Sequence, residues 1–541
     1  MVPDSNMSQE RRRLLRTLGA TAGAGILAGC MGGDDNTGSD GSTPADDDSS
    51  GESILGGEIL AGIEGDIGGL DPHTMVEDTS WRVNHNLYEG VLRRGPQLDM
   101  EPILAENWEI SDDGMTYTFD LREGVMFHPP EDREMVADDV VYSWERISDP
   151  EVSARAGFWD PAGDIYAEDD YTVVIEMDEP STPFQFNLNE MIMARDAPEK
   201  YNLNEVSVGT GPFMFDEYGE GDFIRITPHE NYWGEDDDGN QLPYVDQVEF
   251  TVTPEGATRA TSIRTGEIDA LFQVPMAQVD SIGAEDDVTT HSIPGITFDY
   301  ITFDMRKDVL SDRTFREAVA WTIDREDMTT AGHFGYATPT HTPVNPETEL
   351  GQAIEIDEDR LHHQDFDRAQ ELIEESDYDG ENFEILCVAG FDHHVAMAEV
   401  LNDNLREIGV ETTINSLEQE AVFDRGLFDP HDFEILVMSW GGIIDPNMHL
   451  SINVRTGEGL NQPGYGDEEL DELINAGAQA VQVEERADIY EDVFDRLLED
   501  LPYIYLDWHE TTAAVRSRLN GYTPFPYSAG ALKFRDVWLD D

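Results

Sequence analysis

The chain has 541 residues, 39% of them hydrophobic, so its length predicts several domains and its composition lets each domain bury a core. Acidic residues number 116 against 32 basic residues, which gives a formal net charge of −84. Because binding to nucleic acid needs a basic surface, this charge excludes nucleic acid as a partner.

The acidic residues are scattered through every segment and do not form one block. At molar salt the Debye length falls to about 3 Å, so the mutual repulsion of these charges is screened. A basic ligand is the alternative explanation for the charge. We favour a protein adapted to high salt, kept soluble by its charge, and we expect it to lose structure in dilute buffer.

The first thirty residues have the layout of an export signal. A basic cluster precedes a short, weakly apolar run rich in Gly and Ala, too short to span a membrane. The order Arg11-Arg12-x-Leu14-Leu15 fits a twin-arginine signal. Beyond this segment no apolar run is long enough to predict a membrane-spanning helix. Residues 1–30 are therefore predicted to be a twin-arginine lipoprotein signal peptide.

The signal ends in "LAGC", which reads as a lipobox with Cys30 as the lipidated residue. The alternative is an incidental cysteine in an ordinary cleavage region. Two acyl chains are needed for stable anchoring, because each buried CH₂ contributes only about 0.8 kcal/mol. Residues 31–56 are rich in Gly, Ser, Thr and Asp, and we expect them to form a disordered acidic tether. The folded body would then work at the outer face of a membrane.

From residue 57 onward, strand and helix patterns continue without another low-complexity segment. Apolar residues alternate in 117–121, 173–177 and 248–252, which predicts half-buried strands. Apolar stripes of helical period run through 315–323, through 397–408 and through 490–501. The stripe that ends at Ile408 is followed by Gly409, a residue typical of a helix end. Mixed strands and helices with no internal repeat predict α/β lobes.

The sequence offers little chemistry that would make the chain an enzyme. Cys387 lies in "FEILCVAG", the pattern of a buried strand, and is expected to be an inert core thiol. The pairs His362-His363 and His393-His394 have no zinc-finger or HExxH spacing, so no metal site and no cofactor are predicted. The "GTG" at 209–211 is followed by Pro212 and a strand, so it is not a phosphate loop.

One ordered series of local signals lies in "LAENWEISDDGMTYTFDLREGVMFHPPEDREMVADDVVYSWERI", residues 104–147. A strand through Trp108 reaches a tight turn at Asp112-Asp113-Gly114, and a second strand pairs back. Asp138 is then expected to cap a helix.

This series resembles the signature of the peptide/nickel family of ABC-transporter solute-binding proteins, extracellular solute-binding family 5. Further segments follow in the family's order: "LYEGVLRRG" (87–95), "VGTGPFMFDEY" (208–218), "HENYWG" (229–234), "RTGEIDAL" (264–271), "FREAVAWTIDRE" (315–326) and a final helix through "EDLPYIYL" (499–506).

The resemblance implies a two-lobed periplasmic-binding-protein-like α/β fold of class II, cluster C type, with a hinge and an additional inserted domain. Ligand would be enclosed between the lobes, and the closed form would dock on a membrane permease. The implied division is lobe I at 57–92, 206–303 and 507–541, inserted domain II at 93–205, and lobe III at 304–506.

Peptide binders of the family carry a Trp in a loop after a lobe III strand, then an Asp for the peptide ammonium, then an acidic-Pro pair. Here the strand "FEILVMSW" leads into Gly441 and Gly442, so Trp440 matches the Trp. Ile443 stands where the family has the ammonium-binding Asp. Asp445 matches the trailing pair, although a turn residue before Pro446 is the plainer explanation. A buried ammonium without a carboxylate costs several kcal/mol, so this departure bears on the ligand.

Two more tryptophans complete the candidate ligand-binding set, Trp81 before the 87–95 segment and Trp508 near a lobe edge; core packing is the alternative for each. The resemblance implies a monomeric, exported and lipid-anchored binding component of an ABC importer that delivers an oligopeptide or dipeptide to its permease and ATPase subunits. An oligosaccharide or metal chelate as ligand, and a surface sensor without transport, remain alternatives.

Overall fold

The computed structural model describes residues 56–75, 77–95, 98–428, 430–457, 460–526 and 532–540. The predicted signal peptide, Cys30 and nearly all of the tether lie outside these residues. Within the described part of the chain, no helix combines the length and the apolarity needed to cross a membrane.

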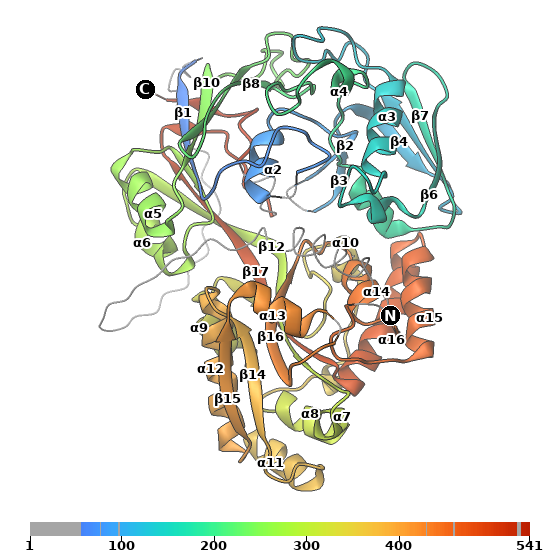
Figure 1. Ribbon diagram of the computed structural model, residues 1–541, viewed down its shortest axis with the longest axis vertical. Helices are drawn as coiled ribbons and strands as arrows, with labels where there is room; N and C mark the ends of the chain where they lie inside the picture. Colours follow the sequence, from blue (N-terminus) through green and yellow to red (C-terminus); the bar gives the residue numbers. More distant parts are fainter. Residues whose placement is uncertain are drawn as a thin grey trace, which may run out of the picture.

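One mixed sheet of eleven strands runs through the whole molecule (Figure 1). Its order is β15-β14-β16-β12-β17-β11-β1-β10-β9-β8, with β13 paired to β17. The strands are β1 (Glu58–Ile63), β8 (Phe213–Gly219), β9 (Phe223–Pro228), β10 (Gln247–Val252), β11 (Ala270–Phe272), β12 (Val288–Phe303), β13 (Ala337–Pro339), β14 (Asn382–Val388), β15 (Glu411–Leu417), β16 (Ile435–Gly441) and β17 (Tyr503–Arg516).

The two longest strands, β12 and β17, connect the two lobes. The first half of β12 pairs with the end of β17 beside β11, in the upper lobe of Figure 1, which we define by β1 and β8–β11. The second half of β12 pairs with β16, in the lower lobe, which we define by β14–β16. The pairing of β12 with β17 shifts register between Pro294 and Phe298 and again between Asp299 and Tyr300, so the irregular stretch marks the hinge.

A side domain stands beside the upper lobe (Figure 1). Its sheet has the order β4-β5-β7-β6, and its elements are β2 (Leu92–Arg94), β3 (Met100–Pro102), β4 (Ala105–Ile110), β5 (Thr116–Leu121), β6 (Ala162–Ala167), β7 (Thr172–Met177), α3 (Ala137–Ile147), η1 (Ala156–Trp159) and η2 (Thr182–Asn187). Phe119 of β5 meets Trp144 of α3 edge to face at 5.3 Å, in a core continuous with that of the upper lobe.

Helices cover both faces of the lower half of the sheet. Side chains of α8 (Arg313–Ala320), α9 (Arg325–His333), α11 (Phe366–Glu375) and α12 (Asp392–Glu407) pack on one face. Side chains of α13 (Gln419–Gly426), α14 (Asn447–Asn453), α15 (Glu468–Gln479) and α16 (Val483–Asp500) pack on the other. The other described helices are α2 (Asp78–Asn84), α4 (Ala197–Lys200), α5 (Gly256–Thr265), α6 (Val279–Gly283), α7 (Asp308–Ser311), α10 (Glu349–Ala353), η3 (Met276–Gln278) and η4 (Glu358–Arg360). Two short strands, β18 (Leu519–Asn520) and β19 (Trp538–Leu539), pair with each other.

The predicted strands at 117–121, 173–177 and 248–252 are confirmed as β5, β7 and β10, with their alternating apolar residues turned into the core. The three helical stripes are confirmed in α8, α12 and α16, although the last residues of each stripe lie past the helix end. Cys387 is a buried free thiol in β14, and burial raises its pKa, so it is the inert core residue that was expected.

Two local predictions are wrong. Asp138 does not cap α3, because it lies exposed in the first turn after the N-cap Val136. The neighbouring Asp139 is buried against the Arg133 guanidinium, and its carboxylate accepts the N–H of Val136 at 3.1 Å. The final helix does not continue through 499–506 either: α16 ends at Asp500, Leu501 turns into the left-handed region at φ 50°, and β17 begins at Tyr503.

Candidate functional site

Within the described structure the lower lobe contacts both the upper lobe and the side domain. At the hinge the two lobes share β12 and β17. Away from the hinge, Thr182 at the start of η2 donates its hydroxyl to the carbonyl of Ala480, just past α15, at 2.6 Å. Between these contacts Leu98, Ile296 and Ile444 form a small buried apolar cluster, which we call the boundary cluster. Its three members come from the segment after β2, from the hinge and from the loop after β16.

The loop 441–445 therefore lies at the boundary between the lobes, as the resemblance implied. Gly441 and Gly442 are exposed, and Gly442 has φ 80°, which favours glycine. Ile443 is buried and donates its N–H to the carbonyl of Ile296 at 3.0 Å. The position at which the family places an ammonium-binding carboxylate thus holds a buried aliphatic side chain.

Asp445, the second acid of this loop, is held within the protein. Its side chain is 2% exposed, and one oxygen accepts from Nη2 of Arg486 at 2.6 Å. The other oxygen accepts the N–H of Asn447 at 2.9 Å, at the first turn of α14. Burial opposes the charge on Arg486, but the charge of Asp445 raises the pKa of that guanidinium above its ordinary value. This carboxylate serves the fold, and nothing in its surroundings directs it at a ligand.

Two of the predicted tryptophans stand in one aromatic row. Phe298 of β12 is the register partner of both Trp440 in β16 and Trp508 in β17. Trp508 packs edge to face on Phe298 with ring centroids 5.0 Å apart, and Trp440 meets His449 at 6.2 Å. Both indoles are buried, at 6% and 2% exposed, and with Phe298 they belong to the core of the lower lobe.

The third predicted tryptophan, Trp81, lies in the upper lobe on α2 and is not brought near the other two. Its ring is half-buried, with the Arg155 guanidinium over it at 4.4 Å and the His85 ring 5.7 Å away. His85 in turn lines the cavity described next. Trp81 is therefore a neighbour of a cavity wall in the upper lobe.

A cavity of about 350 Å³ opens in the upper lobe beside β2. Four of the chain's 32 basic residues line it, together with only three of its 116 acids. The charged lining residues are Glu89, Arg93, Arg94, Glu101, Lys533, Arg535 and Asp536. Phe525 also lines the cavity, lies under the Lys533 ammonium at 4.5 Å and packs against the boundary cluster. Phe525 thus joins the wall of the cavity to the boundary cluster, whereas the lining residues all lie outside 304–506.

Glu89 is the buried acid of this cavity. Its carboxylate accepts from the Tyr232 hydroxyl at 2.7 Å, from Trp233 Nε1 at 3.0 Å and from the Thr210 hydroxyl at 3.2 Å. Burial raises its pKa, against these hydrogen bonds, which lower it. The Glu89 carboxylate is thus held by its own wall. Arg93 pairs with Glu101 at 2.8 Å and Arg535 with Asp536 at 3.0 Å, and Arg94 and Lys533 are the other two basic residues of the lining.

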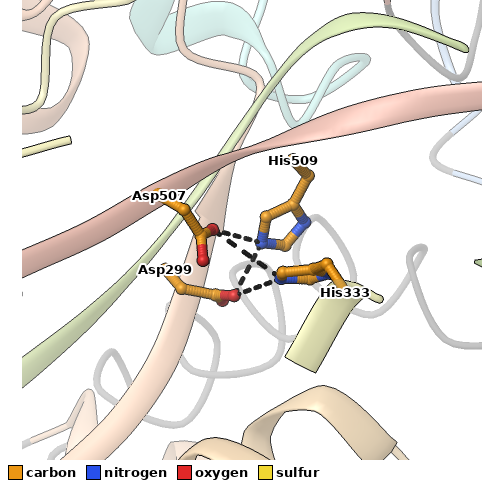
Figure 2. A group of neighbouring side chains, drawn as sticks. All are labelled: Asp299, His333, Asp507 and His509. Carbon is orange, nitrogen blue, oxygen red and sulfur yellow. Dashed lines mark hydrogen bonds and ion pairs between the residues drawn. The ribbon is translucent and has the colours of Figure 1, made fainter. Parts of the chain in front are cut away.

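A second cluster, unconnected with this cavity, lies at the hinge (Figure 2). Asp299, His333, Asp507 and His509 come from β12, α9 and β17, and each offers a ligand atom within 4.8 Å of the others. His393 and His394 at the start of α12 approach the same Asp299. We call these six residues the hinge cluster.

The prediction that the chain has no metal site did not anticipate this cluster. The pair His393-His394 has no metal-ligand spacing of its own, and the two aspartates of the cluster lie about a hundred residues away on either side. One signal was available: Asp507 and His509 alternate on a strand, so both point to the same face.

A family model described as "Bacterial extracellular solute-binding proteins, family 5 Middle" matches residues 99–461. Among curated proteins, the Heme-binding protein A of Haemophilus influenzae is 27% identical over 501 residues, which cover 85% of this chain and 89% of that protein. The Oligopeptide-binding protein AppA of Bacillus subtilis is 22% identical over 88% of this chain and 91% of its own length.

Among solved structures, the ABC transporter substrate-binding protein CtaP of Listeria monocytogenes superposes with a TM-score of 0.81. It is 23% identical and covers 90% of this chain and 100% of its own. At that identity the likeness establishes the fold, and it confirms the expected two-lobed architecture.

Proposed function

Because the chain belongs to family 5 of the bacterial extracellular solute-binding proteins, we propose that it captures a short peptide between its lobes and delivers it to the permease of an ABC importer. The peptide-binding relative AppA and the peptide/nickel signature at 104–147 support the class of ligand. A hinge made of two shared strands suits a protein whose lobes close over a solute.

The proposal of a peptide ligand rests on the basic residues in the wall of the cavity. In a chain with net charge −84, a wall with more cations than acids needs a specific reason. A cavity of the upper lobe with Arg94 and Lys533 in its wall suits a carboxylate, and a peptide presents one at its C-terminus. The apolar ring of Phe525 and the boundary cluster offer a surface for the neighbouring side chain.

The loop 441–445 argues against recognition of a free α-amine at the family's usual place. Ile443 has no charge to offer, and both oxygens of Asp445 are occupied by Arg486 and Asn447. We therefore assign selection of the peptide to its C-terminal carboxylate. In this proposal the buried row of Trp440 and Trp508 forms an apolar floor for the loop.

Calorimetry in molar salt with matched peptides tests this assignment. We expect C-terminal amidation to weaken binding by about tenfold or more, because a charge-assisted hydrogen bond contributes about 1.5–3 kcal/mol. N-terminal acetylation should change the affinity by less than that. Equal affinity for free and amidated peptides would remove the carboxylate from the proposal. Binding of an oligosaccharide or a heme in place of every peptide would overturn the peptide itself.

Variants of the cavity wall locate the site. Lys533→Gln removes a cation from the cavity, whereas Arg225→Gln removes one from β9, where Arg225 pairs with Glu249 at 2.8 Å outside the cavity. We expect only the first to weaken peptide binding, by about tenfold. Equal effects of both variants would show that the general charge of the chain, and not the cavity, governs binding.

We further propose that the protein is exported by the twin-arginine route and anchored through Cys30, with residues 31–56 as its tether. Cys30→Ser should release the protein from membranes without changing peptide affinity, as measured by fractionation of cells. Retention of the variant would mean that an uncleaved signal holds the chain. Sensing without transport is the alternative role, which uptake of labelled peptide by cells with and without the protein would separate from import.

Adaptation to high salt is part of the same proposal. The circular-dichroism spectrum should lose intensity when molar salt is exchanged for dilute buffer, because the repulsion among 116 acids is then unscreened. An unchanged spectrum would contradict it.

A further inference from the structure

The hinge cluster contains two carboxylates in direct opposition. Asp299 of β12 and Asp507 of β17 are register partners, immediately beside the second register shift. Both side chains are 0% exposed. Like charges placed directly opposite one another in a sheet destabilise it, and burial makes the cost larger.

The two carboxylates lack the lysine or arginine partner that usually neutralises a buried acid. Among the described residues, no lysine or arginine lies within 4.0 Å of either carboxylate, and the basic groups that do approach them are imidazoles. Neither oxygen of Asp507 has a hydrogen-bond partner in the described structure. Buried polar atoms are satisfied in the great majority of cases, so an unpartnered buried carboxylate indicates a missing group.

The imidazoles are arranged around the same point. His333 Nε2 lies 2.7 Å from Oδ2 of Asp299 and 3.7 Å from Oδ1 of Asp507. His509 Nε2 lies 2.9 Å and 3.7 Å from the same two oxygens. Figure 2 shows both rings directing a nitrogen at the carboxylate pair. Two imidazole nitrogens and two carboxylate oxygens thus face one small volume.

We propose that these four residues, Asp299, His333, Asp507 and His509, form a binding site for a divalent transition-metal ion of the zinc class. Zinc takes nitrogen and oxygen ligands tetrahedrally at about 2.0–2.2 Å, which places neighbouring ligand atoms about 3.3 Å apart. The four distances above, from 2.7 to 3.7 Å, bracket that spacing. An ion of charge +2 would also balance the two opposed carboxylates.

A second layer of side chains holds the ligands in place. Oδ1 of Asp299, the oxygen turned away from His333, accepts the Ser439 hydroxyl at 2.7 Å, and Ser439 meets His394 Nε2 at 2.6 Å. Nδ1 of His333 lies 3.3 Å from the sulfur of Met276 in η3. Metal ligands are commonly oriented by such outer contacts, which fix the carboxylate and the imidazole before the ion arrives.

The site is separate from the proposed solute site. Neighbouring residues of a strand point to opposite faces of the sheet. Asp299 follows Phe298 and Asp507 precedes Trp508, so the four ligands stand on the α9 and α12 side while the aromatic row stands on the other. The ion would join both hinge strands to the end of α9, and it would remain in place whichever solute the lobes enclose. The inference therefore does not depend on the peptide.

Metal titration of the chelator-treated full chain in molar salt tests the proposal. Zn²⁺ should bind with equimolar stoichiometry and raise the melting temperature, because an ion that binds only the folded state stabilises it. Mg²⁺, which prefers six oxygen ligands, should do neither. Co²⁺ in the same protein should give the intense visible absorption of a tetrahedral nitrogen and oxygen site. Absence of Zn²⁺ binding, or a weak octahedral Co²⁺ spectrum, would overturn the proposal.

Matched variants assign the ligands. His509→Gln should weaken Zn²⁺ binding by more than about 100-fold, whereas His363→Gln, at an exposed histidine outside the cluster, should leave it unchanged. Trp440→Ala, on the opposite face, should also retain the ion. Circular dichroism of the chelated variants checks that each has folded. Loss of Zn²⁺ binding in Trp440→Ala but not in His509→Gln would place the metal in the solute site and overturn the assignment.

Discussion

Two buried aspartates, Asp445 after β16 and Asp507 in β17, differ in the partners that the protein gives them. Asp445 is 2% exposed and has a guanidinium at 2.6 Å and a backbone N–H at 2.9 Å. Asp507 is 0% exposed and has no hydrogen bond to either oxygen in the described structure. The protein thus supplies hydrogen-bond partners to both oxygens of Asp445 and to neither oxygen of Asp507.

The comparison separates two uses of buried charge. Sequence resemblance pointed at Asp445 because it follows a matching tryptophan, but its partners show a residue that fastens the start of α14 to α16. Asp507 matched no motif, yet its lack of a partner is the observation that indicates a bound group. A completed hydrogen-bond set is thus evidence for a structural role, whatever the sequence position suggests.

We expect the largest change in the free energy of unfolding when the ion pair of Arg486 with Asp445 is broken. Arg486→Met should lower the free energy of unfolding by about 3–5 kcal/mol, because it leaves the Asp445 carboxylate buried without a counter-charge. Denaturant unfolding in molar salt measures it. The double variant Arg486→Met with Asp445→Asn should recover part of the loss. A single variant as stable as the parent would show that Asp445 is not held as the structure has it.

Acid should reveal a third class of buried group, one that stays neutral. His449 of α14 is buried between Phe298 and Tyr505, and burial lowers its pKa to about 3. The unfolded chain, with an ordinary pKa near 6.5, therefore takes up a proton that the folded chain refuses. This stability is present above pH 6.5 and is lost toward pH 3, by about 1.4 kcal/mol per pH unit.

His449→Gln measures that contribution against the parent protein. Between pH 6.5 and 4.5 the free energy of unfolding of the parent should fall more steeply than that of the variant. The difference in slope should approach about 1.4 kcal/mol per pH unit, the value for one proton. Parallel curves would mean that the imidazole is protonated in the folded state.

A smaller effect, opposite in sign, is expected at the Asp507 carboxylate. In the presence of a chelator, Asp507→Asn should raise the free energy of unfolding by about 1 kcal/mol, because burial and the charge of Asp299 raise the pKa of Asp507 and make its charge costly. Asp445→Asn should lower it. The comparison fails if the two substitutions shift stability in the same direction.

The smallest effect provides the baseline. Arg406 and Asp403 form an exposed pair on α12 at 2.7 Å, with side chains 59% and 72% exposed. Arg406→Gln should change the free energy of unfolding by less than about 0.5 kcal/mol in molar salt. A loss comparable to that of Arg486→Met would show that exposed charges, and not burial, dominate stability in this chain.

Much of the fold could be predicted because its signals are local. Alternating residues such as those of 117–121 and stripes such as that of α12 depend on neighbours within a few positions, and they were confirmed. The errors arose where a distant contact decided the outcome. Asp139, and not Asp138, is buried at the start of α3 because it binds the Arg133 guanidinium. Residues 503–506 form a strand because they pair with β12.

The sites show the same division. The loop 441–445 could be placed from a single segment, although the partner that occupies Asp445 lies 41 residues further on. The hinge cluster could not be placed, because its ligands span 299–509 and meet only through the pairing of β12 with β17. Sequence spacing reveals a metal site when the ligands share an element, and here they are divided among three.

The path of β12 and β17 also governs when the protein can fold. In the upper lobe Ile59 pairs with Val248, and toward the lower lobe Ile301 pairs with Ile504, so both lobes depend on partners roughly two hundred residues apart in the chain. β17 lies in the middle of the sheet and is the last of its eleven strands to be synthesised. Neither lobe can complete its sheet before β17 has been synthesised, and such high contact order slows folding. The nascent chain must therefore be kept from aggregating until β17 has emerged, and any truncation before residue 503 removes the strand that both lobes share.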